Sequence, residues 1–394
     1  MAARGYFSGL SRNTVLLAFS SLFADISTEM LYPVLPVFLT QTLGASGSLV
    51  GLIEGVAGAT QSVVQGFSGS LSDKLQRRKP IALVGYGLAA IAKPLIGIST
   101  GWQGVLGGRF LDRLGTGIRS APRDALIASS VDEENRGRAF GLEGAGDNAG
   151  AFLGPVLAVI LLSGLHVAVR LIFYIAVIPG LLAWSMIALV SEKGSIKAVA
   201  KAKIGPARFP SAYWKYLAAT AIFGIGNSSN VFLILQTKSL GASLTTTILI
   251  YAAFNLVAAL ISYPAGALSD RFGRRNLVLA AFAVFLGAYL GFALTSNIVI
   301  IGALFILYGL FQGIFRSAGK ALASDLVTAE TRASGVGWYS TTVGLSGLVA
   351  SLVAGLLWDR VGHGAVFLYG AILAVAGAVA LLALVPARLV RMSP

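Results

Sequence analysis

The chain has 394 residues, of which 56% are hydrophobic and only 12% are charged, and its net charge is +14. A soluble globular protein carries about a quarter charged residues, so this composition excludes a water-soluble fold and predicts a protein that lies mostly in lipid. The absence of cysteine excludes disulfides, thiol catalysis and cysteine-based metal sites.

Twelve apolar runs follow one another along the chain, each near the length of about 20 residues that a helix needs to cross a bilayer. The polar segment 191–212, which is rich in Lys and Ser, separates six runs from the other six and is predicted to be a cytoplasmic linker. We therefore expect an all-α membrane protein with an N-terminal six-helix bundle at 1–190 and a C-terminal six-helix bundle at 213–394. The runs lie at 14–40, 46–72, 80–99, 102–124, 137–162, 168–190, 213–237, 244–268, 276–296, 298–324, 334–357 and 364–387.

Basic residues concentrate in the loops on one side of these runs, whereas only Arg170, Lys238 and Arg360 fall in loops on the other side. Such an asymmetry follows the positive-inside rule, so both termini are predicted to lie in the cytoplasm and the runs in the cytoplasmic membrane. The positive charge is thus explained by topology, and we expect no nucleic-acid partner. The basic loop residues include Arg4, Arg12, Lys74, Arg136, Lys215, Arg271, Arg332 and Arg388.

The first run carries Asp25 and Glu29, which lie four residues apart and therefore on one helical face. Two carboxylates close together in a low-dielectric environment repel each other when both are charged, so one of them tends to hold a proton. We expect a proton-coupling or cation-binding role, with a structural ion pair to a cation on the third or fourth run as the alternative. Pro33 and Pro36 should bend or loosen the outer half of this run.

A loop motif occurs twice, as GSLSDKLQRR at 69–78 and as GALSDRFGRR at 266–275. The first copy follows the second run and the second copy follows the eighth run. Each copy places an Asp at a helix end and several cations just beyond it. Two half-length repeats that meet at the midplane are a common architecture of secondary transporters.

In this position the motif resembles the signature loop of the major facilitator superfamily, and it is similar to the drug/proton antiporters among its members. The resemblance covers the whole chain and implies the major facilitator fold, with two pseudo-symmetric six-helix bundles. In that family the Asp and Arg residues clamp neighbouring helix ends and bias the inward-closed state. A simple stop-transfer cluster of positive charge is the alternative. The gating role is thereby assigned to Asp73, Arg77, Arg78, Asp270, Arg271 and Arg274.

The fourth run contains Arg113, followed by Thr116 and Gly117. This segment resembles a superfamily pattern in which the arginine is associated with proton coupling. The corresponding place in the tenth run has Gln312 and Gly313 and lacks the arginine. We therefore expect the coupling chemistry in the N-terminal half, with Arg113 acting on the carboxylates of the first run.

The fifth run contains Gly150, Gly154 and Pro155, which are similar to part of a pattern that is typical of superfamily antiporters. In that pattern small residues and a proline kink allow tight packing against a neighbouring helix. The partial match favours antiport, and hence export, over uptake. Asp147 in the same run lies at mid-depth and joins the first-run carboxylates as a candidate proton carrier.

Polar and aromatic side chains elsewhere in the runs suit a cavity that binds a small solute by shape and a few hydrogen bonds. Two pairs of cations could attract an anionic group of the substrate, or they could neutralise carboxylates at the cytoplasmic mouth, and we favour the second role. The pairs are Arg119 with Arg123 and Arg316 with Lys320. The expected cavity residues are Glu54, Arg119, Asn227, Asn230, Tyr251, Asn255, Gln312 and Arg316, and the further gating residues are Asp124, Gly150, Gly154 and Pro155.

These expectations combine into a monomeric, proton-coupled secondary transporter that moves a small solute by alternating access, as an exporter by proton antiport. An importer, or a divalent-metal transporter of the same fold with Asp25 and Glu29 as its cation site, is the alternative. No nucleophile motif stands out, so we expect no enzymatic activity and no catalytic residue. His166 and His363 are too isolated for a metal site, and we expect no cofactor.

Overall fold

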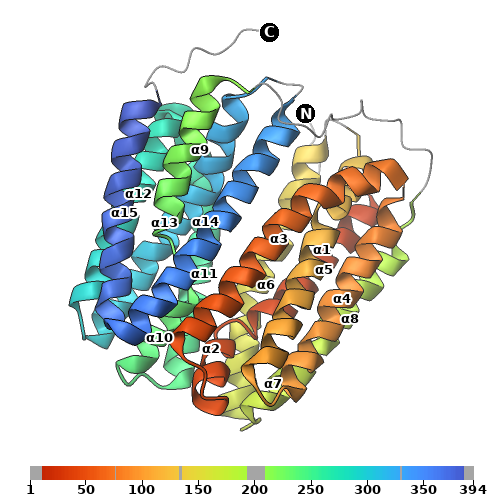
Figure 1. Cartoon of the computed structure of the whole chain (residues 1–394). Coiled ribbons are helices and arrows are strands. Elements are labelled where there is room, and N and C mark those ends of the chain that lie inside the picture. The colour runs from red at the N-terminus through yellow and green to blue at the C-terminus, as the bar shows by residue number, and fades with distance from the viewer. Residues whose placement is uncertain (1–10, 76, 133–134, 193–208, 329–330, 386–394) are drawn as a thin grey trace, which may run out of the picture.

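The computed structural model describes residues 11–75, 77–132, 135–192, 209–328 and 331–385, and within these ranges its regular elements are all helical (Figure 1). The first six predicted runs form helices with short breaks. Their elements are α1 (Arg12–Glu29), α2 (Leu35–Val37), the π-helical η1 (Phe38–Thr42), α3 (Gly47–Leu75), α4 (Arg78–Ile98), α5 (Trp102–Ser129), α6 (Arg136–Val159), the π-helical η3 (Ile160–Gly164), α7 (Val169–Ile175) and α8 (Val177–Leu189).

The second six runs form a matching series. Its elements are α9 (Ser211–Gly224), α10 (Val231–Ser239), α11 (Leu244–Phe272), α12 (Arg274–Leu294), α13 (Ile298–Asp325), α14 (Arg332–Arg360) and α15 (His363–Leu384). Each predicted run therefore corresponds to one helix or to two or three consecutive helical elements, and the prediction of an all-α fold with twelve spans in two halves is confirmed.

In the described part of the chain, nine helices are long and apolar enough to cross a membrane. The three remaining spans are not both long and apolar enough, for two physical reasons. Helices α1 and α5 carry several charged residues, and the seventh span is broken into α9 and α10 at 225–230. Charged residues and broken backbone are tolerated at membrane depth where they face protein or a watery path, so these three spans are the places to look for function.

The first span bends where its prolines predict a bend. Helix α1 ends at Glu29, and the chain passes through a turn before α2 and η1 complete the span. Pro33 has no N–H to donate to the preceding turn, which disfavours continuation of α1, and Pro36 stands in the first turn of α2, where an N–H would have no helical partner.

The helices form two groups that meet at one end of the molecule. Most helices of α1–α8 pack on one another, as do most of α9–α15. Helix α14 is the exception, because its most extensive contact is with α3 of the other group, and α6 also contacts α11. Helix α1 begins and α15 ends at the same end of the molecule, the upper end in Figure 1. We call this end the terminal face and the other end the opposite face.

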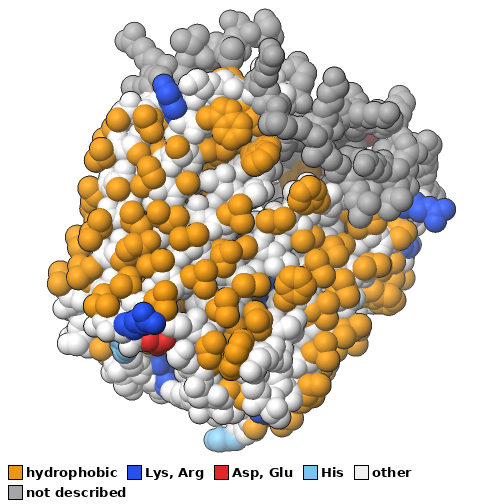
Figure 2. All heavy atoms as spheres, viewed as in Figure 1, with side chains coloured by type: hydrophobic (Ala, Val, Ile, Leu, Met, Phe, Trp, Pro, Cys, Tyr) orange, Lys and Arg blue, Asp and Glu red, His pale blue; other side chains and the backbone are white. Residues whose placement is uncertain are grey.

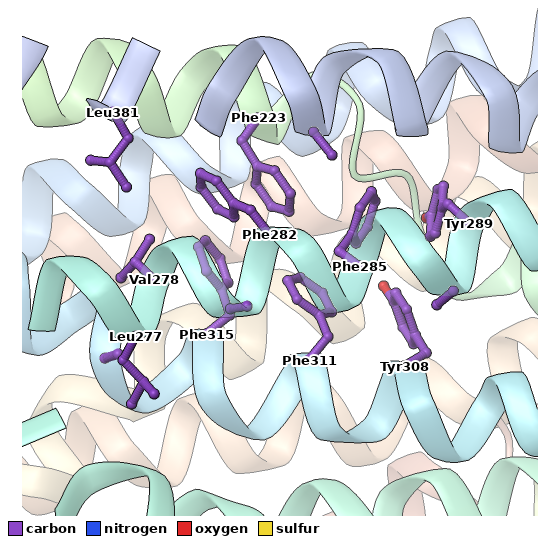
Figure 3. Packing of buried hydrophobic residues seen from close by; sticks show 14 of the residues in the cluster. Phe223, Leu277, Val278, Phe282, Phe285, Tyr289, Tyr308, Phe311, Phe315 and Leu381 are labelled. Atoms are coloured by element: carbon purple, nitrogen blue, oxygen red, sulfur yellow. The ribbon is translucent and has the colours of Figure 1, made fainter. Parts of the chain in front are cut away.

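An aromatic core fills the C-terminal group. Phe223 of α9 stacks on Phe282 of α12 with ring centroids 4.0 Å apart, and Phe285, Phe311 and Phe315 surround this pair (Figure 3). Van der Waals contacts between such closely packed rings hold these helices to one another in a lipid environment. Apolar side chains also spread over both groups on the face that Figure 2 shows, and lipid contact requires such a surface.

Candidate functional site

Helices α1 and α6 pack at backbone distance through the glycines that the sequence singled out. A Cβ atom added at Gly150 would lie 2.5 Å from the carbonyl oxygen of Leu22, and one added at Gly154 would lie 2.8 Å from the amide nitrogen of Met30. Real Cβ atoms do not approach so closely, so larger residues here would force the helices apart. The predicted tight packing of this pattern against a neighbouring helix is therefore present, and the neighbour is α1.

This close contact brings three carboxyl groups together. The carboxyl group of Asp25 on α1 lies within hydrogen-bond reach of Asp147 on α6, and Glu29 lies one turn farther along α1. Arg119 attracts Asp25 electrostatically, and Arg113 attracts Glu29 in the same way. Two carboxyl groups in hydrogen-bond contact avoid mutual repulsion by sharing a proton, so the arrangement can take up and release one.

Glu29 also contacts the other group of helices. The hydroxyl of Tyr251 on α11 donates to its Oε2 at 2.9 Å, and the side-chain amide of Asn255 approaches the same oxygen at 3.5 Å. The same amide donates to the carbonyl oxygen of Ala151 on α6 at 3.0 Å. That carbonyl lacks its usual helical donor because Pro155, four residues later, has no N–H. The proline thus provides a free acceptor to which the C-terminal group attaches.

A second set of charges is buried inside the N-terminal group. Arg109 pairs with Glu54 at 2.7 Å and with Asp112 at 3.3 Å, and Asp112 also pairs with Lys93 at 3.3 Å and with Arg113 at 3.3 Å. Arg109, Glu54, Asp112 and Lys93 are all at most 7% exposed. Such a network joins α3, α4 and α5, and removal of any one member would leave a buried charge without its partner.

This network contains residues that sequence reasoning missed. Among the cations of the third and fourth runs, Lys93 and Arg109 pair with Asp112 and Glu54 rather than with the carboxylates of the first run. Arg113 and Arg119 are the fourth-run cations that attract Glu29 and Asp25. Glu54, expected in the substrate cavity, is engaged in this ion pair. Two features of the sequence pointed to this network. One is the single cation Lys93 in the apolar run of α4, and the other is the pair of opposite charges, Arg109 and Asp112, three residues apart on α5.

A third cluster lies nearer the terminal face. Arg123 pairs with Glu143 of α6 at 3.0 Å and with its neighbour Asp124 at 3.0 Å, and it donates to Ser21 of α1 at 3.1 Å. The guanidinium of Arg119 lies over the ring of Tyr86, 4.3 Å from its centroid. These contacts all stay within the N-terminal group. Arg123 thus neutralises carboxylates here, in keeping with the role that we favoured for it.

The break between α9 and α10 places polar groups at mid-depth in the C-terminal group. The hydroxyl of Tyr308 donates to Asn230 at 2.9 Å and to Asn227 at 3.2 Å. Ser229 in the same break bonds to the hydroxyl of Tyr32 at 3.1 Å. The ring of Tyr32 stacks on Tyr251 with centroids 5.4 Å apart. Ser229 is therefore linked to Glu29 through Tyr32 and Tyr251. The predicted cavity residues Tyr251 and Asn255 contact Glu29 directly.

The remaining cavity candidates lie on α13. Gln312 is partly buried, whereas Arg316 and Lys320 are exposed. Lys320 is attracted electrostatically by Asp124 and Asp147 of the other group. Lys320 of the C-terminal group is therefore within electrostatic range of carboxylates of the N-terminal group on the side toward the terminal face.

The predicted gating loops are described only in part. The side chains of Asp73 and Asp270 lie outside the described residues, so their clamping role stays a prediction. Arg77 and Arg271 are exposed, and Arg78 is buried and donates to the carbonyl oxygen of Ala125 at 3.1 Å. Arg274 pairs with Asp325 at 2.8 Å.

Comparison with known proteins identifies the family. The model of the Major Facilitator Superfamily matches residues 17–229 and 216–393, which together cover nearly the whole chain. The chain belongs to this superfamily. The resemblance seen in the loop motifs is therefore confirmed, and the protein is a secondary transporter.

One relative, an uncharacterized MFS-type transporter of Methanocaldococcus jannaschii, is 34% identical over 380 residues, which is 95% of each chain. Among solved structures, the nucleoside transporter NupG has a TM-score of 0.77 at 14% identity and covers 95% of this chain and 99% of its own. The D-xylose-proton symporter has a TM-score of 0.73 at 16% identity, with 95% and 97% covered. At these identities the two structures show the shared fold.

Proposed function

We propose that this transporter couples the movement of a small solute to protons and exports it by proton antiport through alternating access. One observation carries the proposal: Glu29, beside the Asp25–Asp147 pair, accepts hydrogen bonds from Tyr251 and Asn255 of the other six-helix group. The site that holds a proton is therefore also a site that joins the two groups. A change in its charge changes the strength of their contact.

The direction of this coupling follows from the hydrogen bonds. A charged carboxylate accepts hydrogen bonds about twice as strongly as a neutral group, so the contact is strongest when Glu29 is ionised. Protonation of Glu29 weakens its bonds to Tyr251 and Asn255 and so favours separation of the groups at the opposite face. The basic loops support a cytoplasmic position for the terminal face and both termini. A proton that arrives from outside the cell would then reach Glu29 while the opposite face is open.

Export is supported by the packing of α1 against Gly150 and Gly154, the elements of the antiporter pattern. We further propose that the protein works as a monomer in the cytoplasmic membrane, since each chain holds both six-helix groups.

The alternatives within the superfamily are uptake, for which the D-xylose-proton symporter is a precedent in fold, and transport of a divalent metal. Among the residues that the structure describes, no group of three or more His, Cys, Asp or Glu side chains is arranged to hold a metal ion. The grouping of Asp25 with Asp147, and of Glu29 with a tyrosine and an amide, is better suited to a proton.

The test is transport in proteoliposomes that enclose a pH-sensitive dye, screened over candidate solutes. We expect solute movement to change the internal pH, and expect Asp25→Asn, Glu29→Gln and Asp147→Asn each to abolish that change. Asp132→Asn, which removes an exposed carboxylate outside the spans, is the matched control and should behave as the parent protein. Solute movement without a pH change would contradict proton coupling, and a pH change of the sign of co-transport would contradict export.

A further inference from the structure

At the opposite face, a carboxylate of one group caps a helix of the other. Asp359, in the last turn of α14, accepts from the backbone amides of Gly47 and Ser48, at 2.8 Å each, and these residues begin α3. Its Oδ2 also accepts from the hydroxyl of Ser48 at 2.5 Å. Both carboxylate oxygens of Asp359, a residue of α14, thus accept hydrogen bonds from the first turn of α3.

This arrangement is unusual because a helix start is normally capped by the residue just before it. Here Ser46 performs only part of that task, since its hydroxyl accepts from the amide of Leu49 at 3.3 Å. The amides of Gly47 and Ser48 depend on Asp359. The partial positive charge at a helix start strengthens bonds to a carboxylate, so the contact is charge-assisted in three places.

Glycines allow the end of α14 to approach the start of α3 closely enough for Asp359 to cap it. A Cβ atom at Gly47 would lie 2.6 Å from Trp358, and one at Gly355 would lie 2.5 Å from the carbonyl oxygen of Gly47. Gly51 meets the carbonyl oxygen of Ser351 in the same way. Helices α3 and α14 therefore touch through their backbones at this end, side by side as Figure 1 shows.

The end of α14 is held firmly in its own group. The ring of Trp358 stacks on His363 with centroids 3.8 Å apart and lies 5.8 Å from the ring of Phe232. His363 in turn bonds to Ser239 at 3.2 Å. Asp359 is thus carried by a rigid corner of the C-terminal group, and relative movement of the two groups must either keep its bonds to α3 or break all of them together.

We propose that Asp359 is the latch of the opposite face: its carboxylate caps α3 while that face is closed and leaves α3 when the face opens. The proposal rests on alternating access but not on proton coupling or on the direction of transport. It assigns to Asp359 and the start of α3 a switching role separate from the loop motifs near Asp73 and Asp270, which lie toward the terminal face. The latch resists opening, so its removal increases the fraction of open molecules.

The test uses the absence of cysteine in the chain. Val231 is 1% exposed and packs in the cluster of side chains that both groups share near the opposite face, so Val231→Cys introduces one thiol that reacts only when this face opens. The rate of maleimide labelling of purified, reconstituted protein is measured in this background. Loss of three charge-assisted bonds by Asp359→Ala should raise the rate about tenfold or more.

Arg360→Gln is the matched control, because it removes the neighbouring exposed charge, and its labelling rate should equal that of the parent. Ser48→Ala, which removes one of the three bonds, should raise the rate about threefold. If Asp359→Ala does not fold, the labelling rate of Ser48→Ala tests the latch by itself. Equal labelling rates for Ser48→Ala, Asp359→Ala and Arg360→Gln would overturn the proposal. Because no solute or proton is involved, failure of the latch is distinguished from failure of the coupling mechanism.

Discussion

At the scale of single residues, Asn255 is the most informative side chain, because it contacts both Glu29 and the carbonyl oxygen that Pro155 leaves free. Asn255→Ala removes one good hydrogen bond between the groups, worth about 1 kcal/mol, and should shift the closed-to-open ratio about fivefold toward an open opposite face. Labelling of Val231→Cys measures this shift. Asn276→Ala, whose amide donates to the carbonyl oxygen of Phe272 within the C-terminal group, is the control and should show none.

A double-mutant cycle tests whether the contact of Asn255 depends on the carbonyl oxygen that Pro155 leaves free. In a Pro155→Ala background the new N–H can donate to Ala151, so that oxygen no longer depends on Asn255. The effect of Asn255→Ala should then shrink. If the two substitutions act independently, the freed carbonyl does not hold the groups together.

At the scale of helices, the α1–α6 contact sets the spacing of the carboxyl groups. Gly150→Ala would place a Cβ atom 2.5 Å from Leu22, so we expect loss of about 1–3 kcal/mol of stability and a separation of Asp25 from Asp147. Gly144→Ala on the same helix meets nothing within 4 Å and should be neutral or stabilising by up to about 1 kcal/mol. Thermal unfolding in detergent compares the two. Equal melting temperatures would contradict the close packing.

At the scale of the whole molecule, Lys320 faces the carboxylates of the other group toward the terminal face. Closure of that face should bring its ammonium group to Asp124 and Asp147. We expect Lys320→Glu to replace attraction by repulsion, to hold the terminal face open and to lower the transport rate at least tenfold. The combined Asp124→Lys and Lys320→Glu exchange should recover part of the rate. No recovery, with both proteins folded, would mean that the two residues do not meet.

Much of this fold was predictable from the sequence, since apolar runs and two copies of a loop motif directly determine span number and family. The spacing of Asp25 and Glu29 likewise identified one face of α1. The partners of charged residues were not predictable in the same way. Whether Arg109 pairs with Glu54 or with Glu29 depends on the rotation of α3 and α5 about their axes, which a single sequence does not specify. The cap by Asp359 joins residues more than 300 positions apart and leaves no local pattern.

The glycine contact between α3 and α14 has a consequence for the speed of switching. Where two helices touch through Gly47, Gly51 and Gly355, there are few side-chain rotamers to reorder when the surfaces slide or separate. Interdigitated large side chains would have to leave one set of holes and enter another, at a cost in conformational entropy for each. We therefore expect the barrier between states to come mainly from a few breakable polar contacts. Exchange rates should then respond steeply to their removal and only weakly to the membrane's own viscosity.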